Sequence, residues 1–582
     1  MKTSTIIVVA SYLLAMSPQS ELAGQIQPPD LILRSGKIVT VNRRFEIAEA
    51  MAVRGDRIVA VGHDSKVLEL AGPDTKVINL DGKMVIPGLI DSHVHSTGAA
   101  VYEYDHPVPV MNTIADVLEH IKQRANALQD GQWIRLSQVF ITRLEDQRFP
   151  TRQELDSVAP DNPVVFRTGP DQALNSLALK LSGIDKETKF PEGRVGVIEK
   201  DPQTGELTGI IRNAGSLIKY QSAERRPEFA DRQTELKKLI ANYNSVGITS
   251  ISDRNASDSA VEQWRTLKDE GGLNVRVFLY YSLNANLPLA DVDARIKKAT
   301  SNPLHEHNNM LWLRGIKVFL DGGMLTGSAY MNKPWGVSKI YSITDPEYRG
   351  TRYIDPERLY QVSLRVLDAG LQMTAHSVGD GAVSTLVQAY ATIDADNFKV
   401  AAARPCITHC NFMSRESIKE MARLGIVADL QPAWLYMDGK TLLKQFGQKR
   451  TKYFQPYRSL FDRGVIVGGG SDHMQKIGSL RSVNPYNPFL GMWITLQRQP
   501  RNMDGILHAE QRLKRHEALR LYTINNAYLT FEEKVKGSLE VGKLADFVVV
   551  DRDILEVELD AIKDTQVLRT YIGGRLVYAA SE

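Results

Sequence analysis

The chain has 582 residues, more than one compact domain usually holds, so a large barrel with smaller accessory units is the natural expectation. Hydrophobic residues make up 43% and charged residues 24%, which excludes a disordered or fibrous protein. The formal net charge of +3 gives no basic surface for nucleic acid, and 2 cysteines exclude a disulfide framework.

Residues 1–25 are typical of an export signal. Lys2 precedes an apolar run from Ile6 to Met16, and a polar segment follows that run. The run is too short for a comfortable transmembrane helix. We therefore expect a signal peptide and an exported protein, periplasmic or secreted. The alternative is an uncleaved N-terminal anchor that tethers the protein, because no clean cleavage site stands out.

Short strands separated by turns are expected at both ends of the chain. Residues 31–80 contain several such runs, among them 37–41 and 57–61. The tail contains two more, 545–550 and 573–578. We expect residues 26–84 and 531–582 to form the two parts of one small β-sandwich outside a central body.

Eight apolar runs between these ends have the character of buried strands. They are residues 84–90, 248–252, 275–281, 315–320, 372–375, 406–408, 426–430 and 465–467. Amphipathic stretches such as 231–246, 356–368 and 414–424 adjoin them. Strand and helix repeated in this way predict an α/β fold, a (β/α)8 TIM-like barrel over residues 85–530. Residues 96–246 are too long for a loop and predict a folded insertion after strand 1.

In such a barrel the reactive groups lie at the carboxyl ends of the strands. The first run is followed by Asp91-Ser92-His93-Val94-His95. Residues two apart on a strand share a face, so His93 and His95 point into the same mouth. Two imidazoles on one face suit a divalent cation.

Lys317 is expected to point into the barrel. Its neighbours Ile316, Val318 and Leu320 share the opposite face of the same run. A buried ammonium is costly unless it is paired or chemically changed. Two interpretations stay open: a carbamate formed with CO2 that bridges two metals, or an ion pair with an acid such as Asp472.

Three further runs end in residues suited to metal or acid–base chemistry, namely His376, His409 and Asp472. Each alone is an ordinary polar residue at a strand end. Together with His93, His95 and Lys317 they predict a metal centre. Cys406 and Cys410 flank His409, and we expect them to be buried core residues rather than thiolate ligands.

With these motifs the sequence resembles the amidohydrolase superfamily, and more narrowly its YtcJ-like branch, from about Leu31 to the C-terminus. The most specific stretches are 87–95, 315–323, 376–380, 404–409, 431–432, 471–472 and 537–546. The resemblance implies hydrolysis of non-peptide C–N bonds, in an amide, N-substituted formamide or cyclic amide of a small molecule. It also implies that His93, His95 and Asp472 hold one metal, that His376 and His409 hold a second, and that Lys317 bridges both as a carbamate.

The mechanism implied by the resemblance uses one or two divalent ions, with zinc expected from the nitrogen and oxygen ligands. A water shared by two cations has a lowered pKa, and Asp472 is the catalytic residue that accepts its proton. The alternatives are a deaminase of the same superfamily, an esterase-type hydrolase with the same site, and a scaffold without metal. Deaminases tend to place a glutamate soon after the fifth-strand histidine, and residues 377–380 contain none.

Substrate contacts are expected from Asn175, Trp434 and Tyr436, with core packing as the alternative for the two aromatic residues. Relatives usually carry Gly-His six residues before Asn-Ser, whereas this chain has Gly169-Pro170 before Asn175. A donor often assigned to substrate binding is therefore missing. The expected partner is a small-molecule substrate, with no nucleic acid and no membrane beyond an N-terminal anchor. A homo-oligomer is left open.

Overall fold

The computed structural model describes residues 27–581 except 138, 170, 190–195, 213 and 342. The expected signal peptide, residues 1–25, lies outside the described residues, so its role stays a prediction. Among the helices of the described part, none has both the length and the apolar character needed to cross a membrane.

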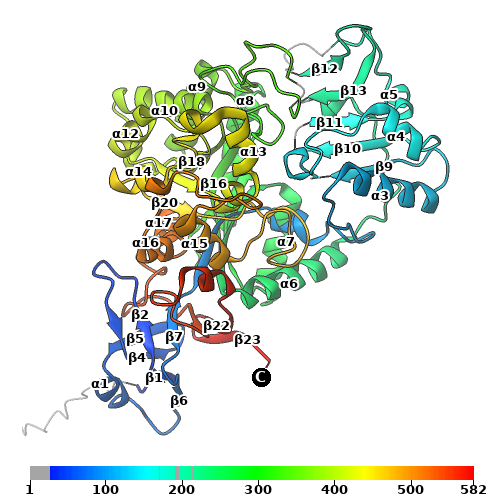
Figure 1. Ribbon diagram of the computed structural model, residues 1–582. Coiled ribbons are helices and arrows are strands. Elements are labelled where there is room, and N and C mark those ends of the chain that lie inside the picture. The colour runs from blue at the N-terminus through cyan, green and yellow to red at the C-terminus, as the bar shows by residue number, and fades with distance from the viewer. Residues whose placement is uncertain are drawn as a thin grey trace, which may run out of the picture.

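Eight parallel strands at the centre of the molecule form a nearly closed barrel (Figure 1). Their order in the sheet is also their order in the chain. They are β8 (Leu89–Val94), β14 (Ile248–Ala256), β15 (Arg276–Ser282), β16 (Leu311–Phe319), β17 (Gln372–Ser377), β18 (Cys406–His409), β19 (Val427–Leu430) and β20 (Val467–Gly469). The predicted α/β fold with a TIM-like barrel is therefore confirmed.

Helices pack around the outside of the barrel. They include α6 (Phe229–Ser245), α7 (Asp258–Asp269), α8 (Leu289–Thr300), α9 (Pro356–Asp368), α10 (Asp380–Ala395), α12 (Arg415–Leu424), α16 (Arg515–Leu521) and α17 (Ile524–Leu529). In α9 the Asp355 side chain caps the first turn and Pro356 opens the helix. Leu359, Val362 and Val366 then recur at helical spacing and are buried. The three stretches predicted as helices are α6, α9 and α12.

Side chains rather than a regular ladder join the first and last barrel strands, which form the two ends of the sheet. The Asn526 amide donates to the carbonyl oxygens of Ile90 at 2.5 Å and Gly469 at 2.8 Å, and accepts from the Gly469 N–H at 3.1 Å. Farther towards the mouth, the Asp472 N–H donates to the His93 carbonyl at 2.8 Å. This seam therefore brings the ends of β8 and β20 together.

Two smaller sheets lie outside the barrel, and the six-stranded one combines strands from both ends of the chain (Figure 1, blue and red). One has the order β23-β22-β21-β7-β2-β3 and the other β5-β4-β1-β6. Their strands are β1 (Leu31–Arg34), β2 (Lys37–Val39), β3 (Ile47–Ala48), β4 (Ala50–Arg54), β5 (Arg57–Gly62), β6 (Lys76–Asn79), β7 (Met84–Pro87), β21 (Phe547–Val550), β22 (Val567–Ile572) and β23 (Arg575–Ala579). Leu33 and Met51 of one sheet share a buried apolar cluster with Val85 and Phe547 of the other.

The apolar run 84–90 belongs to two strands, so the prediction that it forms the first barrel strand is confirmed for residues 89–90 and was wrong for residues 84–87. Its first half is β7, which pairs with β21 in the terminal sheet, and its second half begins β8, which pairs with β14. Gly88 alone lies between them. A Cβ on Gly88 would come within 2.2 Å of Thr249 Oγ1, so the chain crosses here only with glycine. Apolar character does not reveal where a run changes its partner strand.

The long segment between β8 and β14 is folded (Figure 1, cyan). It contains a five-stranded sheet with the order β12-β13-β11-β10-β9. These strands are β9 (Ile134–Ser137), β10 (Val164–Thr168), β11 (Asp171–Leu174), β12 (Val197–Lys200) and β13 (Leu207–Arg212). Helices α3 (Ile114–Ala127), α4 (Arg152–Val158) and α5 (Ser176–Ser182) accompany them. Trp133, Val165, Leu174 and Ile211 form a buried cluster within this insertion, as its length led us to expect.

Candidate metal centre

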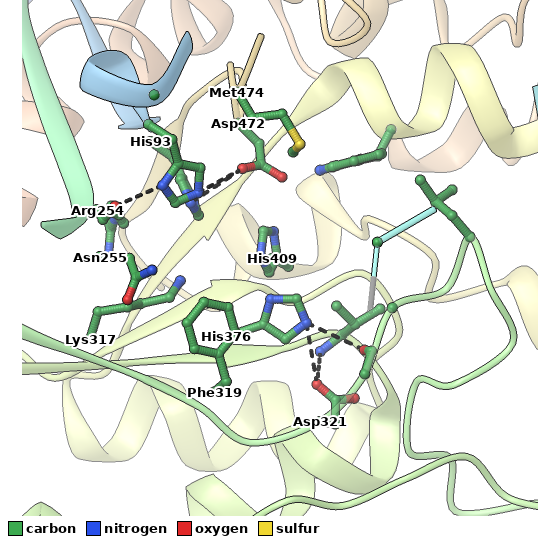
Figure 2. A pocket seen from close by; sticks show the side chains of 18 of the residues that line it. His93, Arg254, Asn255, Lys317, Phe319, Asp321, His376, His409, Asp472 and Met474 are labelled. Carbon is green, nitrogen blue, oxygen red and sulfur yellow. Dashed lines mark hydrogen bonds and ion pairs between the residues drawn. The ribbon is translucent and has the colours of Figure 1, made fainter. Parts of the chain in front are cut away.

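All six residues expected to bind metal line one cavity of about 550 Å³ at the mouth of the barrel (Figure 2). They come from the ends of β8, β18 and β20, from within β17, and from within β16. The six are His93, His95, Lys317, His376, His409 and Asp472. Residues separated by nearly four hundred positions thus meet because parallel strands place their carboxyl ends at one rim.

Three of these residues form a compact group. The Nε2 atoms of His93 and His95 lie 3.4 and 3.3 Å from Asp472 Oδ1. One ligand atom from each residue lies within 4.8 Å of the others. Two imidazole nitrogens and a carboxylate oxygen at this separation fit a divalent cation.

The other two histidines extend this group. The ring centres of His409 and His93 are 5.0 Å apart, and those of His376 and His409 are 4.5 Å apart. Nδ1 of His409 lies 2.7 Å from Gln431 Oε1, which leaves Nε2 as its free nitrogen. Nε2 of His376 lies 3.3 Å from the Gly322 carbonyl, which leaves Nδ1. Each ring therefore keeps one nitrogen for a ligand.

Burial keeps these rings neutral. It lowers the pKa of His93 and of His409 well below the usual range, and the Lys317 amine adds to the effect at both. It lowers the pKa of His376 to about 3. Because a metal binds only the neutral imidazole, the centre does not need to lose protons from these rings at neutral pH.

Lys317 has a buried Nζ atom with no hydrogen-bond partner among the described residues. Burial, followed by the nearby Arg254 charge, lowers the pKa of this amine to about 7. The alternative of an ion pair with Asp472 does not occur in the described part of the chain. An unpartnered amine beside four imidazoles has the chemistry needed to carry a further metal-binding group.

Comparison with known proteins identifies the family. A model of the amidohydrolase family matches residues 76–578. The chain belongs to the amidohydrolase family. It is a metal-dependent hydrolase that acts on carbon–nitrogen bonds other than peptide bonds.

Two curated relatives of this amidohydrolase match along nearly the whole chain. The N-substituted formamide deformylase of Arthrobacter pascens is 29% identical over 95% of this chain and 99% of its own length. YtcJ of Bacillus subtilis is 26% identical over 94% of this chain and 99% of its own length. A solved structure of an uncharacterized metal-dependent hydrolase from Pyrococcus horikoshii has the same fold, with a TM-score of 0.65, 21% identity, and 91% and 99% of the two chains covered.

Two charged residues that contact the candidate ligands of the amidohydrolase were missed in the sequence. Asp429 of β19 accepts from the His93 Nδ1–H at 3.1 Å and from the Ser92 hydroxyl at 2.6 Å. The Arg254 guanidinium lies 3.2 Å from the same carboxylate. The backbone carbonyl oxygen of Arg254 accepts from the His95 Nδ1–H at 2.7 Å. The available signal was a charged residue within or just after an apolar strand, where it must be buried.

Of the three expected substrate contacts, only Trp434 lines the cavity of the amidohydrolase. Asn175 instead caps α5: its Oδ1 accepts from the Val164 and Ala178 N–H groups, and its Nδ2 donates to the carbonyl oxygens of Ala159 and Asn162. These bonds use its amide completely, so it has a structural role. Tyr436 packs against Trp493 with ring centres 6.0 Å apart.

The cavity wall includes residues that sequence reasoning did not single out. Asn255 at the end of β14 has a φ of +66° and a buried Oδ1 with no partner in the described residues. Arg167 and Gly169 of the insertion also line the cavity, whereas Pro170 lies outside the described residues. Phe140, Phe319 and Met474 add apolar surface.

Proposed function

We propose that this amidohydrolase cleaves the C–N bond of a small amide, such as an N-substituted formamide, another N-acyl amine or a cyclic amide. The main observation in support of this function is that four histidines, one aspartate and an unpartnered lysine line the same cavity. The similarity to an N-substituted formamide deformylase supports the substrate class. The metal we propose is zinc, because the ligand atoms are nitrogen and oxygen.

His93, His95 and Asp472 would hold one ion, and His376 and His409 a second. When bound, such ions supply Lewis acidity, which lowers the pKa of a water and polarises the scissile carbonyl. The chain itself supplies proton transfer. Asp472 Oδ1 faces the two imidazoles, and its Oδ2 accepts the proton of the attacking water and returns it to the leaving nitrogen.

Lys317 would join the two halves of the centre after reaction with CO2. The neutral Nζ forms a bond to the carbon of CO2 and releases a proton to solvent, which gives a carbamate with two oxygen atoms. An ordinary lysine is almost entirely protonated at neutral pH, but the pKa of about 7 leaves a large neutral fraction of Lys317. The carbamate also removes the buried ammonium.

The test is an activity screen of metal-loaded protein against N-formyl, N-acyl and cyclic amides. Lys317→Ala removes the bridge, and we expect activity to fall to about one hundredth or less, with a lower metal content. Lys297→Ala is the control, because this lysine is exposed on α8 and should leave both quantities unchanged. Metal content is measured on the same samples.

Full activity of Lys317→Ala would remove the bridging carbamate from the proposal. Ammonia release from amino-substituted heterocycles without cleavage of any amide would assign the site to a deaminase. Reconstitution of metal-free protein with zinc should also depend on bicarbonate in the wild type and lose that dependence in Lys317→Ala. Equal recovery with and without bicarbonate would again count against the carbamate.

A further inference from the structure

Arg167 presents a positive charge to the cavity without a partner of its own. It lies near the end of β10 in the insertion and lines the same cavity as the metal centre. Its Nε–H donates to the Gly169 carbonyl at 3.0 Å. In the described part of the chain, no carboxylate forms an ion pair with it. The two Nη groups are therefore left for a ligand.

The other guanidinium groups near the cavity are paired. Arg254 lies 3.2 Å from Asp429, and Arg143 lies 2.8 Å from Asp438. The carboxylates of the cavity wall are also engaged elsewhere. Asp253 accepts from the Trp264 indole N–H at 2.7 Å, and Asp321 accepts from three backbone N–H groups. None of these groups compensates Arg167.

A second positively charged residue adds to the uncompensated positive charge of Arg167. Arg135 lies on the neighbouring strand β9. Burial lowers the pKa of the Arg167 guanidinium most, and the positive charge of Arg135 lowers it further. A half-buried charge without a counterion is unfavourable, and an anion bound in the cavity would offset that cost. A guanidinium with its two Nη groups free matches the two oxygens of a carboxylate.

We propose that Arg167 binds a carboxylate of the substrate, so that the favoured amide carries an anionic group away from the scissile bond. This inference rests on the proposed amide hydrolysis, and it names the substrate class of that site. Phe319, Trp434 and Met474 supply apolar wall for the body of the same molecule. The favoured substrates are then N-formyl or N-acyl amines with an apolar body and a carboxylate.

Matched substrates isolate the charge. N-formylbenzylamine and N-formyl-4-(aminomethyl)benzoate have the same scissile bond and differ only by one carboxylate. We expect the wild type to prefer the benzoate, and Arg167→Gln to lower kcat/KM for it by about 30-fold or more, chiefly through KM. The neutral substrate should change by less than about threefold. Arg167→Lys should keep part of the preference, because it keeps the charge but loses the paired donors.

Arg135→Gln is the matched control. It removes a charge from the neighbouring strand at a residue outside the cavity wall. Because that charge acts on the anion only at a distance, kcat/KM for the benzoate should fall by less than about threefold, and kcat/KM for the neutral substrate should not change. Thermal unfolding of each variant checks that it is folded. Equal losses on both substrates in Arg167→Gln, or a wild type without preference for the carboxylate, would overturn the assignment.

Calorimetric binding separates this inference from the proposed activity. The probes are 4-methylbenzoate and 4-methylbenzamide, titrated into metal-loaded wild type and Arg167→Gln. Because both proteins contain the same metal, a loss of benzoate affinity without a loss of benzamide affinity isolates Arg167. If that loss occurs while no amide is cleaved, the proposed activity fails and the anion site stands. If amides are cleaved but benzoate binds both proteins equally, the anion site fails alone.

Discussion

Asp429 contacts the His93 imidazole, the Ser92 hydroxyl and the Arg254 guanidinium at once. Asp429→Asn keeps the volume but removes the charge that Arg254 needs. We expect a loss of about 3 kcal/mol in the free energy of unfolding, because a buried guanidinium loses its counterion. Metal affinity should fall by about 10- to 100-fold, because His93 loses the group that orients it. Chemical denaturation and competitive metal titration measure the two effects.

Asp438→Asn is the control for this prediction. Asp438 is also buried and paired, with Arg143, but within the described residues it has no hydrogen bond or ion pair to a candidate metal ligand. We expect a comparable loss of stability with unchanged metal affinity. If both variants lost metal affinity equally, general destabilisation would explain the effect and the specific role of Asp429 would be withdrawn.

At the level of residues, the sequence indicated the six candidate ligands because each one stands within or next to an apolar strand. It could not separate Asn175 as a cap from Asn175 as a substrate contact, since an amide forms the same hydrogen bonds in both. Asp429 and Arg254 were detectable as charges in or beside buried strands. Their partners depend on neighbouring strands and needed the structure.

At the level of elements, Asn526 replaces a missing ladder between β8 and β20. Asn526→Leu leaves the Ile90 carbonyl and both backbone groups of Gly469 without this partner. Each buried unsatisfied group costs about 1–3 kcal/mol, so we expect a clear drop in the denaturation midpoint. Metal content should also fall, because His93 and Asp472 lie on opposite sides of this seam.

Asn525→Leu tests the same change one residue earlier. Asn525 is partly exposed, and within the described part of the chain its side chain donates only to the Val467 carbonyl, at 2.9 Å. Loss of this hydrogen bond should lower the free energy of unfolding by about 1 kcal/mol and leave the metal content unchanged. Equal denaturation midpoints for the two variants would show that the Asn526 hydrogen bonds do not hold β8 and β20 together.

The eight barrel strands were predictable because buried parallel strands are continuous apolar runs. The division of residues 84–90 was not, since β7 and β8 are both apolar and only their partners differ. Within the insertion the sequence shows only two strand-like runs, residues 133–136 and 164–167. Its sheet order depends on pairing between segments that the local pattern does not specify.

For the whole molecule, a buried ion pair fastens the barrel to the terminal sheet. Arg276 opens β15, and its Nε and Nη2 lie 2.6 and 2.8 Å from the two oxygens of Asp546, just before β21. Burial alone would raise the pKa of Asp546, but the Arg276 guanidinium holds it below its usual value. The pair therefore stabilises the fold above the pKa of the unfolded carboxyl, and this contribution is lost as the pH falls through the folded pKa.

Asp546→Asn should lower the free energy of unfolding by about 3 kcal/mol at neutral pH. The difference from wild type should shrink as the pH falls below about 4, because the wild-type carboxyl then becomes protonated. Asp553→Asn is the control: its pair with Lys37 at 2.5 Å is partly exposed and should contribute less than about 1 kcal/mol. A constant difference across the pH range would contradict the assignment.

The cavity has two origins in the chain. The strand ends of the barrel supply the histidines, the lysine and the aspartate at the base of the cavity. Phe140, Arg167 and Gly169 of the insertion supply part of its wall. The insertion has an apolar cluster of its own, but others of its residues, such as Phe166, belong to the main buried cluster that includes the barrel strands. Substitutions at the wall residues of the insertion can therefore change which molecules fit the cavity while the reactive groups at the strand ends stay the same, whereas replacing the whole insertion would also remove apolar contacts of the barrel.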